Sequence, residues 1–90
     1  MKAIFDINKV NPVDLNGEPL VPADRNQVIG NLLFKRALTI EHDQIARNIH
    51  AGKVAEVTSQ DIDYMISVLS EAPIYYYFKS ALIDYLNELK

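Results

Sequence analysis

The chain has 90 residues, a formal net charge of −3 and no cysteine. The missing cysteines exclude disulfides, cysteine-based catalysis and thiolate metal sites. No apolar run reaches the ~18 residues of a membrane helix, and the amino terminus has no signal-peptide core. We therefore expect a cytoplasmic protein without membrane contact. The length suits a single domain over 1–90, with a β-hairpin region at 1–22 and a helical region at 24–90.

Short strands and a tight hairpin are predicted for the amino-terminal region. Residues 2–7 are rich in β-forming side chains. Further on, 13–15 and 20–21 flank Asn16-Gly17, a pair that tolerates the positive φ of a hairpin turn. Pro19 lacks a backbone donor, so the second arm should lie at an edge or end early. Strands this few and this short must pack on helices to be stable.

Two helical segments are predicted next. The first begins at Asp24, a suitable N-cap. Gly30 in its interior costs about 1 kcal/mol relative to alanine, so we expect another backbone to approach closely there. The second covers 41–51, with Thr39 as its cap and Gly52 at the C′ position. The pattern leaves open whether these are two helices or one long kinked helix.

A third helix has the clearest start, with Thr58 as its cap and Asp61 at the N3 position. Pro73 is predicted to end it and to occupy the first turn of a fourth helix, which runs to about Leu89. These elements predict an α+β fold in which an N-terminal β-hairpin packs on a small bundle of three to four α-helices. The predicted core comprises Ile4, Leu15, Ile29, Leu33, Ile45, Ile49, Ile62, Met65, Ile66, Leu69, Phe78, Leu82 and Tyr85.

The last predicted helix is apolar on more than one face. Phe78 and Tyr85 share one stripe. Tyr76 and Ile83 lie on nearly the opposite side. This is more apolar surface than a chain of this size normally leaves in water, which indicates a partner, most simply another copy of the chain. The predicted interface residues are Phe34, Leu38, Tyr75, Tyr76, Ile83 and Leu86.

No pattern in the chain is typical of catalysis, of a cofactor or of a metal site. His42 and His50 would project about 80° apart and about 12 Å apart along a helix, so one metal ion cannot bind both. The serines lack a nucleophile motif, and the glycines lack a phosphate-binding loop. The helix that resembles a recognition helix begins with Asp61 and Asp63, which repel phosphate. We therefore expect no enzyme activity, cofactor, bound metal or nucleic-acid partner.

Two motifs and their order resemble a group of short proteins encoded by tailed bacteriophages and prophages. The matching segments are Leu15-Asn-Gly-Glu-Pro-Leu20 and Val57-Thr-Ser-Gln-Asp-Ile62, followed by a last helix from Pro73. That group has no established activity. The resemblance therefore implies an origin, and it implies no catalytic residue.

The function expected from these patterns is that of a non-enzymatic structural or interaction protein. It would self-associate into a homo-oligomer through its aromatic C-terminal helix. The alternative is a small monomeric regulator that binds a host or viral macromolecule through the same aromatic surface. The two differ in what the purified chain does alone, because only the first assembles without an added partner.

Overall fold

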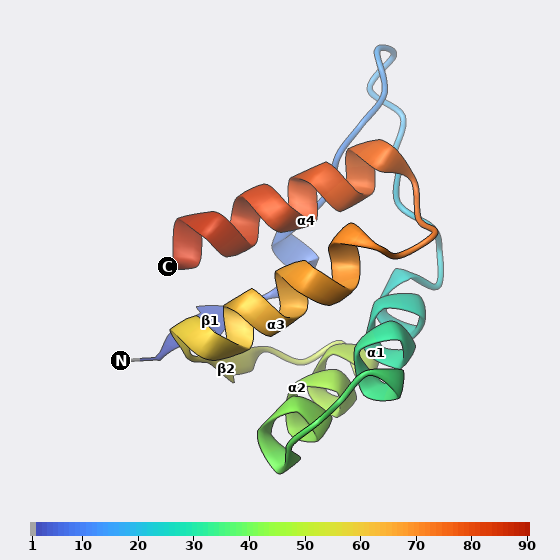
Figure 1. Cartoon of the computed structure of the whole chain (residues 1–90). Helices are drawn as coiled ribbons and strands as arrows, with labels where there is room; N and C mark the ends of the chain where they lie inside the picture. The colour runs from blue at the N-terminus through green and yellow to red at the C-terminus, as the bar shows by residue number, and fades with distance from the viewer. Residues whose placement is uncertain (1) are drawn as a thin grey trace.

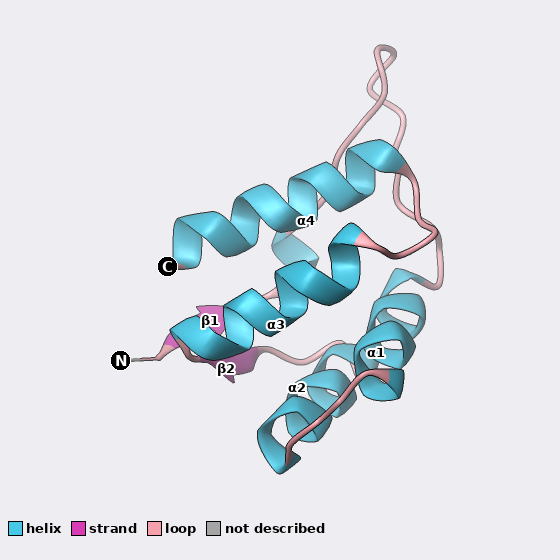
Figure 2. Ribbon diagram, viewed as in Figure 1, coloured by secondary structure: helices cyan, strands magenta, loops and turns pink. Residues whose placement is uncertain are grey.

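The computed structural model describes residues 2–90 and has the predicted α+β fold, with helices and a small sheet (Figures 1 and 2). In the view of Figure 1, α3 and α4 lie above α1 and α2, and the sheet lies near the chain termini. Over residues 2–90, no helix is long and apolar enough to cross a membrane. The elements are β1 (Ala3–Phe5), the 3-10 helix η1 (Ile7–Lys9), α1 (Arg25–Lys35), α2 (Ile40–His50), β2 (Ala55–Val57), α3 (Ser59–Ser70) and α4 (Tyr76–Leu89).

The two strands of the sheet come from distant parts of the chain. β1 pairs antiparallel with β2, which places Phe5 opposite Ala55 and Ile4 opposite Glu56. Successive residues of a strand point to opposite faces, so Phe5 is buried while Ile4 is 50% exposed. The prediction of Ile4 in the core is therefore wrong. Residues 2–7 carry apolar side chains on both faces, and the packing of the sheet decides which face points inward.

The predicted turn at Asn16-Gly17 forms and closes a narrow hairpin over residues 12–20. A single β-bridge joins Val13 to Pro19, and Gly17 has a φ of 82°. The hairpin projects away from the helices in Figure 1, and Leu15 near its tip is fully exposed. The prediction of Leu15 in the core is wrong, because the hairpin is held by its own turn and keeps its tip clear of the helices.

The first two helices are separate, which the sequence had left open. α1 ends at Lys35, and the Thr39 hydroxyl accepts a hydrogen bond from the His42 N–H at the start of α2. The predicted close approach occurs at Gly30, where a Cβ atom would lie 2.7 Å from the His50 Cβ and 2.9 Å from the His50 backbone N. No side chain fits there without a shift, so Gly30 sets the spacing between α1 and α2.

Helix caps follow the predictions in most respects. The Thr58 hydroxyl accepts from the Asp61 N–H at 3.1 Å, and the Asp61 carboxylate accepts from the Thr58 N–H at 2.9 Å, which completes a capping box. Gly52 follows α2 with a φ of 76°, as a C′ glycine does. Asp24 stands at the N-cap of α1, but its side chain makes no capping hydrogen bond.

Pro73 does not begin the last helix. α4 starts at Tyr76, and Pro73 lies in the link between α3 and α4. The cause is local: the Ile74 N–H donates to the Ala72 carbonyl at 2.9 Å, and Tyr75 is extended with a φ of −55° and a ψ of 137°. The chain therefore makes one more turn before helical geometry begins.

One hydrophobic cluster contains residues of both strands and all four labelled helices in the described chain. The Tyr85 hydroxyl accepts from the Asp6 N–H at 3.1 Å and so ties α4 to the end of β1. Among the predicted core residues, Ile66 and Tyr85 are half-buried against the cluster. The fully confirmed core residues are Ile29, Leu33, Ile45, Ile49, Ile62, Met65, Leu69, Phe78 and Leu82. Buried residues outside the predicted core include Phe5, Ile7, Val10, Ala55, Val57, Val68 and Leu86.

Candidate functional site

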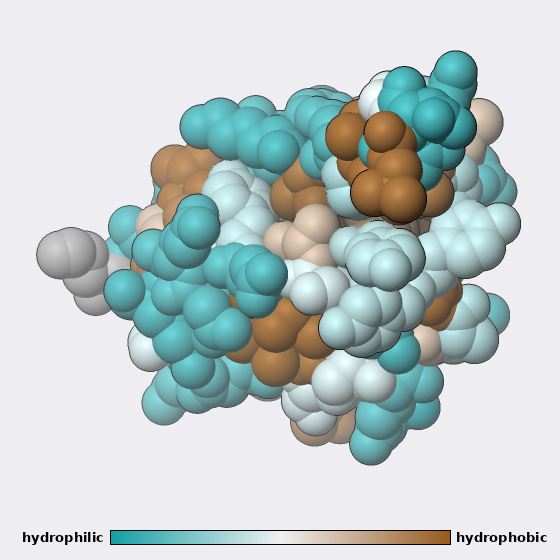
Figure 3. Space-filling view, turned by 90° about the horizontal axis from the view of Figure 1, so that it is seen from above, coloured by the Kyte–Doolittle hydropathy of each residue, from teal (hydrophilic) through white to brown (hydrophobic). Residues whose placement is uncertain are grey.

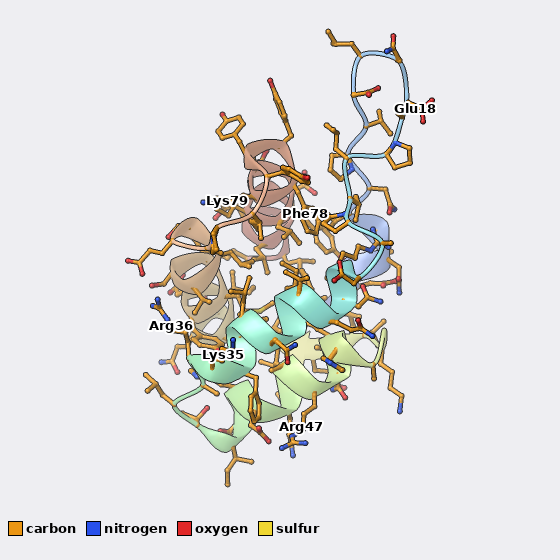
Figure 4. The ribbon with its side chains drawn as sticks, turned by 90° about the vertical axis from the view of Figure 1, so that its right-hand side faces the viewer. Glu18, Lys35, Arg36, Arg47, Phe78 and Lys79 are labelled. Carbon is orange, nitrogen blue, oxygen red and sulfur yellow. The ribbon has the colours of Figure 1, made fainter. Side chains whose placement is uncertain are left out.

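Most large exposed hydrophobic side chains gather at two ends of the molecule, which measures 40 × 23 × 23 Å. We call one the hairpin end, because Figures 1 and 4 show the hairpin and the start of α4 there. We call the other the turn end, because it surrounds the link between α1 and α2. The hairpin end comprises Val13, Leu15, Tyr75, Tyr76 and Tyr77, and the turn end comprises Phe34, Leu38 and Ile40.

Three consecutive tyrosines dominate the hairpin end. Tyr75, Tyr76 and Tyr77 are 67%, 71% and 65% exposed, and the last two rings meet edge to face with centroids 5.2 Å apart. Phe78 follows them and is fully buried, so Tyr75 at the N-cap and the first two residues of α4 face outward. Figure 3 looks onto this end and shows brown hydrophobic surface exposed among hydrophilic groups.

The structure separates the predicted interface residues. Tyr75 and Tyr76 are exposed together at the hairpin end, and Ile83 is half-buried. Phe34 and Leu38 are exposed at the turn end.

Leu86 does not belong to any surface. It is fully buried, four residues beyond Leu82 and eight beyond Phe78, so all three share the inward stripe of α4. The prediction of Leu86 as an interface residue is therefore wrong. Tyr77 is the exposed residue that the sequence analysis missed, although the run of three tyrosines was itself the signal.

A groove runs between α1 and α2 and reaches the turn end at Phe34. It has a volume of about 330 Å³ and is lined by Gly30, Asn31, Phe34, Ala46, Arg47 and His50. The Arg47 guanidinium lies 5.3 Å from the centroid of the Phe34 ring, within the range of a cation–π contact. Arg47 also donates to the Asp43 carboxylate at 3.0 Å. The groove is therefore apolar at Phe34 and Ala46 and basic at its rim.

A polar cluster joins α1, α2 and α3 inside the turn end. The His42 ring stacks on Tyr64 with centroids 3.6 Å apart, and its Nε2 lies 3.8 Å from an Asp61 carboxylate oxygen. The Leu38 N–H donates to His42 Nδ1 at 3.4 Å, and the Tyr64 hydroxyl donates to the Leu33 carbonyl. Each group is engaged with a neighbouring element, so the cluster holds the helices together.

Within residues 2–90, no group of three or more histidine, aspartate or glutamate side chains is placed to hold a metal ion. His42 lies in the first turn of α2 and His50 is its last residue, as the sequence spacing implied. The polar groups of the chain therefore offer no clustered donor set in the part that the structure describes. The exposed apolar ends are its most distinctive surface.

Comparison with protein-family models, with curated proteins and with solved structures found no match for this chain. The resemblance to short phage proteins accordingly stays a prediction. A function has to be inferred from the exposed surface and its chemistry.

Tyr64→Phe is expected to lower the free energy of unfolding by about 0.5–1.5 kcal/mol at neutral pH, because the hydrogen bond to the Leu33 carbonyl is lost. Burial raises the pKa of the Tyr64 hydroxyl above 10.0. The folded chain therefore holds this proton more tightly than the unfolded chain, and the resulting stability is present below pH 10 and is lost as the pH rises through the folded pKa.

Urea unfolding at pH 7 and at several values between about 9 and 11 tests this expectation. The stability difference between the wild type and Tyr64→Phe should shrink at the high end. Tyr76→Phe is the matched control, because that exposed hydroxyl makes no hydrogen bond within residues 2–90. A difference that stays constant up to the highest pH contradicts the role assigned to burial.

Proposed function

We propose that this chain is a small non-enzymatic structural or interaction protein, of phage or prophage origin, that self-associates into a homo-oligomer through the exposed aromatic start of α4. The observation that carries the proposal is the run Tyr75–Tyr77, about two-thirds exposed at the N-cap and the first two positions of an otherwise packed helix. Tyrosine is enriched at protein interfaces because its ring buries while its hydroxyl keeps a polar partner.

The exposed area of the three tyrosines shows how much they can contribute to the free energy of association. An enclosed aromatic side chain buries about 150–250 Å², so two-thirds exposure leaves about 100–160 Å² of each tyrosine for a partner. At about 25 cal/mol per Å², three tyrosines contribute roughly 7–12 kcal/mol. Association costs about 4–15 kcal/mol in lost freedom of motion. The two terms are similar, so the tyrosines need neighbouring surface to hold two copies together.

The solution mass of the purified chain tests the proposal. Light scattering after size-exclusion chromatography, at loading concentrations from about 10 to 500 μM, should show a dimer or larger species whose mass rises with concentration. Tyr76→Glu places a charge in the contact between copies. It should raise the dissociation constant of the oligomer at least tenfold, which corresponds to a loss of about 1.4 kcal/mol or more in the free energy of association.

Val54→Glu is the control, because Val54 is 50% exposed, directly precedes β2 and belongs to neither set of exposed hydrophobic residues. It should associate like the wild type. A wild-type chain that is monomeric at every concentration contradicts the proposal. The aromatic surface would then serve a foreign macromolecule, as in a monomeric regulator.

A further inference from the structure

We propose that the self-association is head-to-tail: the hairpin end of one copy binds the turn end of the next, with Leu15 inserted in the groove beside Phe34. This inference rests on the proposed function, since it requires that the chain self-associates, and it adds which two surfaces meet. Figure 4 shows the hairpin with Glu18 at one end of the molecule, and Lys35, Arg36 and Arg47 on the helices away from it.

The hairpin of residues 12–20 projects from the molecule and has an apolar side chain at its tip. The Asp14 N–H donates to the Glu18 carbonyl at 2.8 Å, and the Leu20 N–H donates to the Pro12 carbonyl at 2.9 Å. The Asp14 carboxylate accepts from the backbone N–H groups of Asn16 and Glu18. These bonds order the turn before any partner binds, which lowers the entropy lost on association. Leu15 is nevertheless fully exposed, so the ordered turn presents an apolar side chain to solvent.

The groove between α1 and α2, which reaches the turn end at Phe34, can take such a side chain. Its volume is about 330 Å³, whereas an engineered protein cavity of about 150 Å³ already holds benzene. Phe34 and Ala46 give it apolar walls. Leu38 and Ile40 lie next to Phe34 and extend this apolar surface. The exposed tyrosines of the incoming copy can pack against them.

Within residues 2–90, one free charge at each end, Glu18 and Lys35, favours contact between unlike ends. Residues 12–20 contain Asp14 and Glu18 and no lysine or arginine. The turn end carries the basic residues Lys35, Arg36 and Arg47, and the acidic residues Glu41, Asp43 and Glu71 lie beside them.

Some of these charges are already engaged. Arg36 pairs with Glu71 at 3.2 Å and Arg47 with Asp43 at 3.0 Å, both at the surface. Lys35 has no ion-pair partner among residues 2–90. The Asp14 carboxylate is used by its own turn, so Glu18 is the acidic group of the hairpin that is left to meet a basic residue of the next copy.

A symmetric dimer is disfavoured by the same charges. Two hairpins face to face would bring the Glu18 carboxylates of both copies together, and like charges across an interface cost free energy. When two copies meet through unlike ends, one hairpin end and one turn end of the pair remain free. Such contacts repeat from copy to copy and produce a ring or a filament.

Mixing two blocked variants tests this geometry. Leu15→Asp blocks the hairpin end and leaves the groove intact, whereas Phe34→Glu blocks the groove and leaves the hairpin intact. Each variant alone should be monomeric at concentrations where the wild type forms species larger than a dimer. An equimolar mixture should form a 1:1 heterodimer and nothing larger, because only one productive contact remains. Val54→Asp should assemble like the wild type, and circular dichroism should show that all variants are folded.

The outcomes separate this inference from the proposed function. A wild-type chain that stays monomeric overturns both. Blocked variants that still assemble alone show that other surfaces meet, which overturns the head-to-tail contact and leaves self-association standing. A mixture that remains monomeric also overturns it. If either blocked variant is unfolded, the surface variants Glu18→Lys and Lys35→Glu are used in place of both. An equimolar mixture of these two should associate at least tenfold more tightly than either variant alone.

Discussion

Phe5→Ala is expected to lower the free energy of unfolding by about 3–5 kcal/mol, as removal of a buried phenylalanine ring usually does. Phe5 is fully buried, and its ring lies 5.3 Å from that of Tyr85 on α4. Folded domains are stable by only about 5–15 kcal/mol. The substitution should therefore leave a chain that is barely folded at 25 °C. The midpoint of urea unfolding, followed by circular dichroism, measures the effect.

Ile4→Ala is the matched control for this substitution. Ile4 is the neighbouring residue on the same strand and points to the exposed face of the sheet, opposite Glu56. Its replacement should cost at most about 0.5 kcal/mol, as surface substitutions usually do. A larger loss at Ile4 than at Phe5 would contradict the register of β1 against β2, because a shift by one residue exchanges the two faces.

Gly30→Ala is expected to destabilise the chain by about 1–3 kcal/mol, the usual cost of adding atoms to a packed contact. The new Cβ would lie 2.7 Å from the His50 Cβ and 2.9 Å from the His50 Cα, so α1 and α2 would have to move apart. In an unpacked helix the same change stabilises by about 1 kcal/mol, because alanine favours the helix over glycine. The sign of the effect therefore distinguishes a close helix contact from an ordinary helical position.

Asn31→Ala controls for helix propensity in the Gly30 experiment. Asn31 is the next residue of α1 and is exposed, so alanine there should leave stability unchanged or raise it by up to about 0.5 kcal/mol. Thermal or urea unfolding of both variants compares them directly. Stabilisation by Gly30→Ala to the same degree would show that α1 and α2 do not approach as closely as Gly30 and His50 do in this structure.

The features that depend on a few neighbouring residues were predictable. The N-cap at Thr58 with Asp61 at N3, the hairpin turn at Asn16-Gly17 and the C′ position of Gly52 all formed as predicted. Each rests on bonds or backbone angles within about four residues. Most of the helix-borne core was predictable for a similar reason, since apolar positions at a period of 3.6 mark the buried side of a helix.

The errors arose where both faces of an element are apolar. Ile4 and Phe5 are adjacent β-formers, and only the packing of the sheet shows that Phe5 points inward. On α4, Leu86 and Tyr76 both carry apolar side chains, and the contact with the core turned Leu86 inward and left Tyr76 exposed. Periodicity supplies the angle between two side chains, but it does not supply the direction of the core.

The candidate site also combines features set by local sequence with features set by tertiary packing. The sequence by itself determined that a run of tyrosines starts the last helix, that a tight turn stands near Leu15, and that Gly30 leaves room for a close neighbour, because each follows from residue type and spacing. Only the tertiary structure decided that the hairpin and the tyrosines share one end of the molecule, while Phe34, Leu38 and Arg47 lie at the other. That arrangement depends on contacts between residues distant in the sequence, such as β1 with β2 and α1 with α2, which no local pattern specifies.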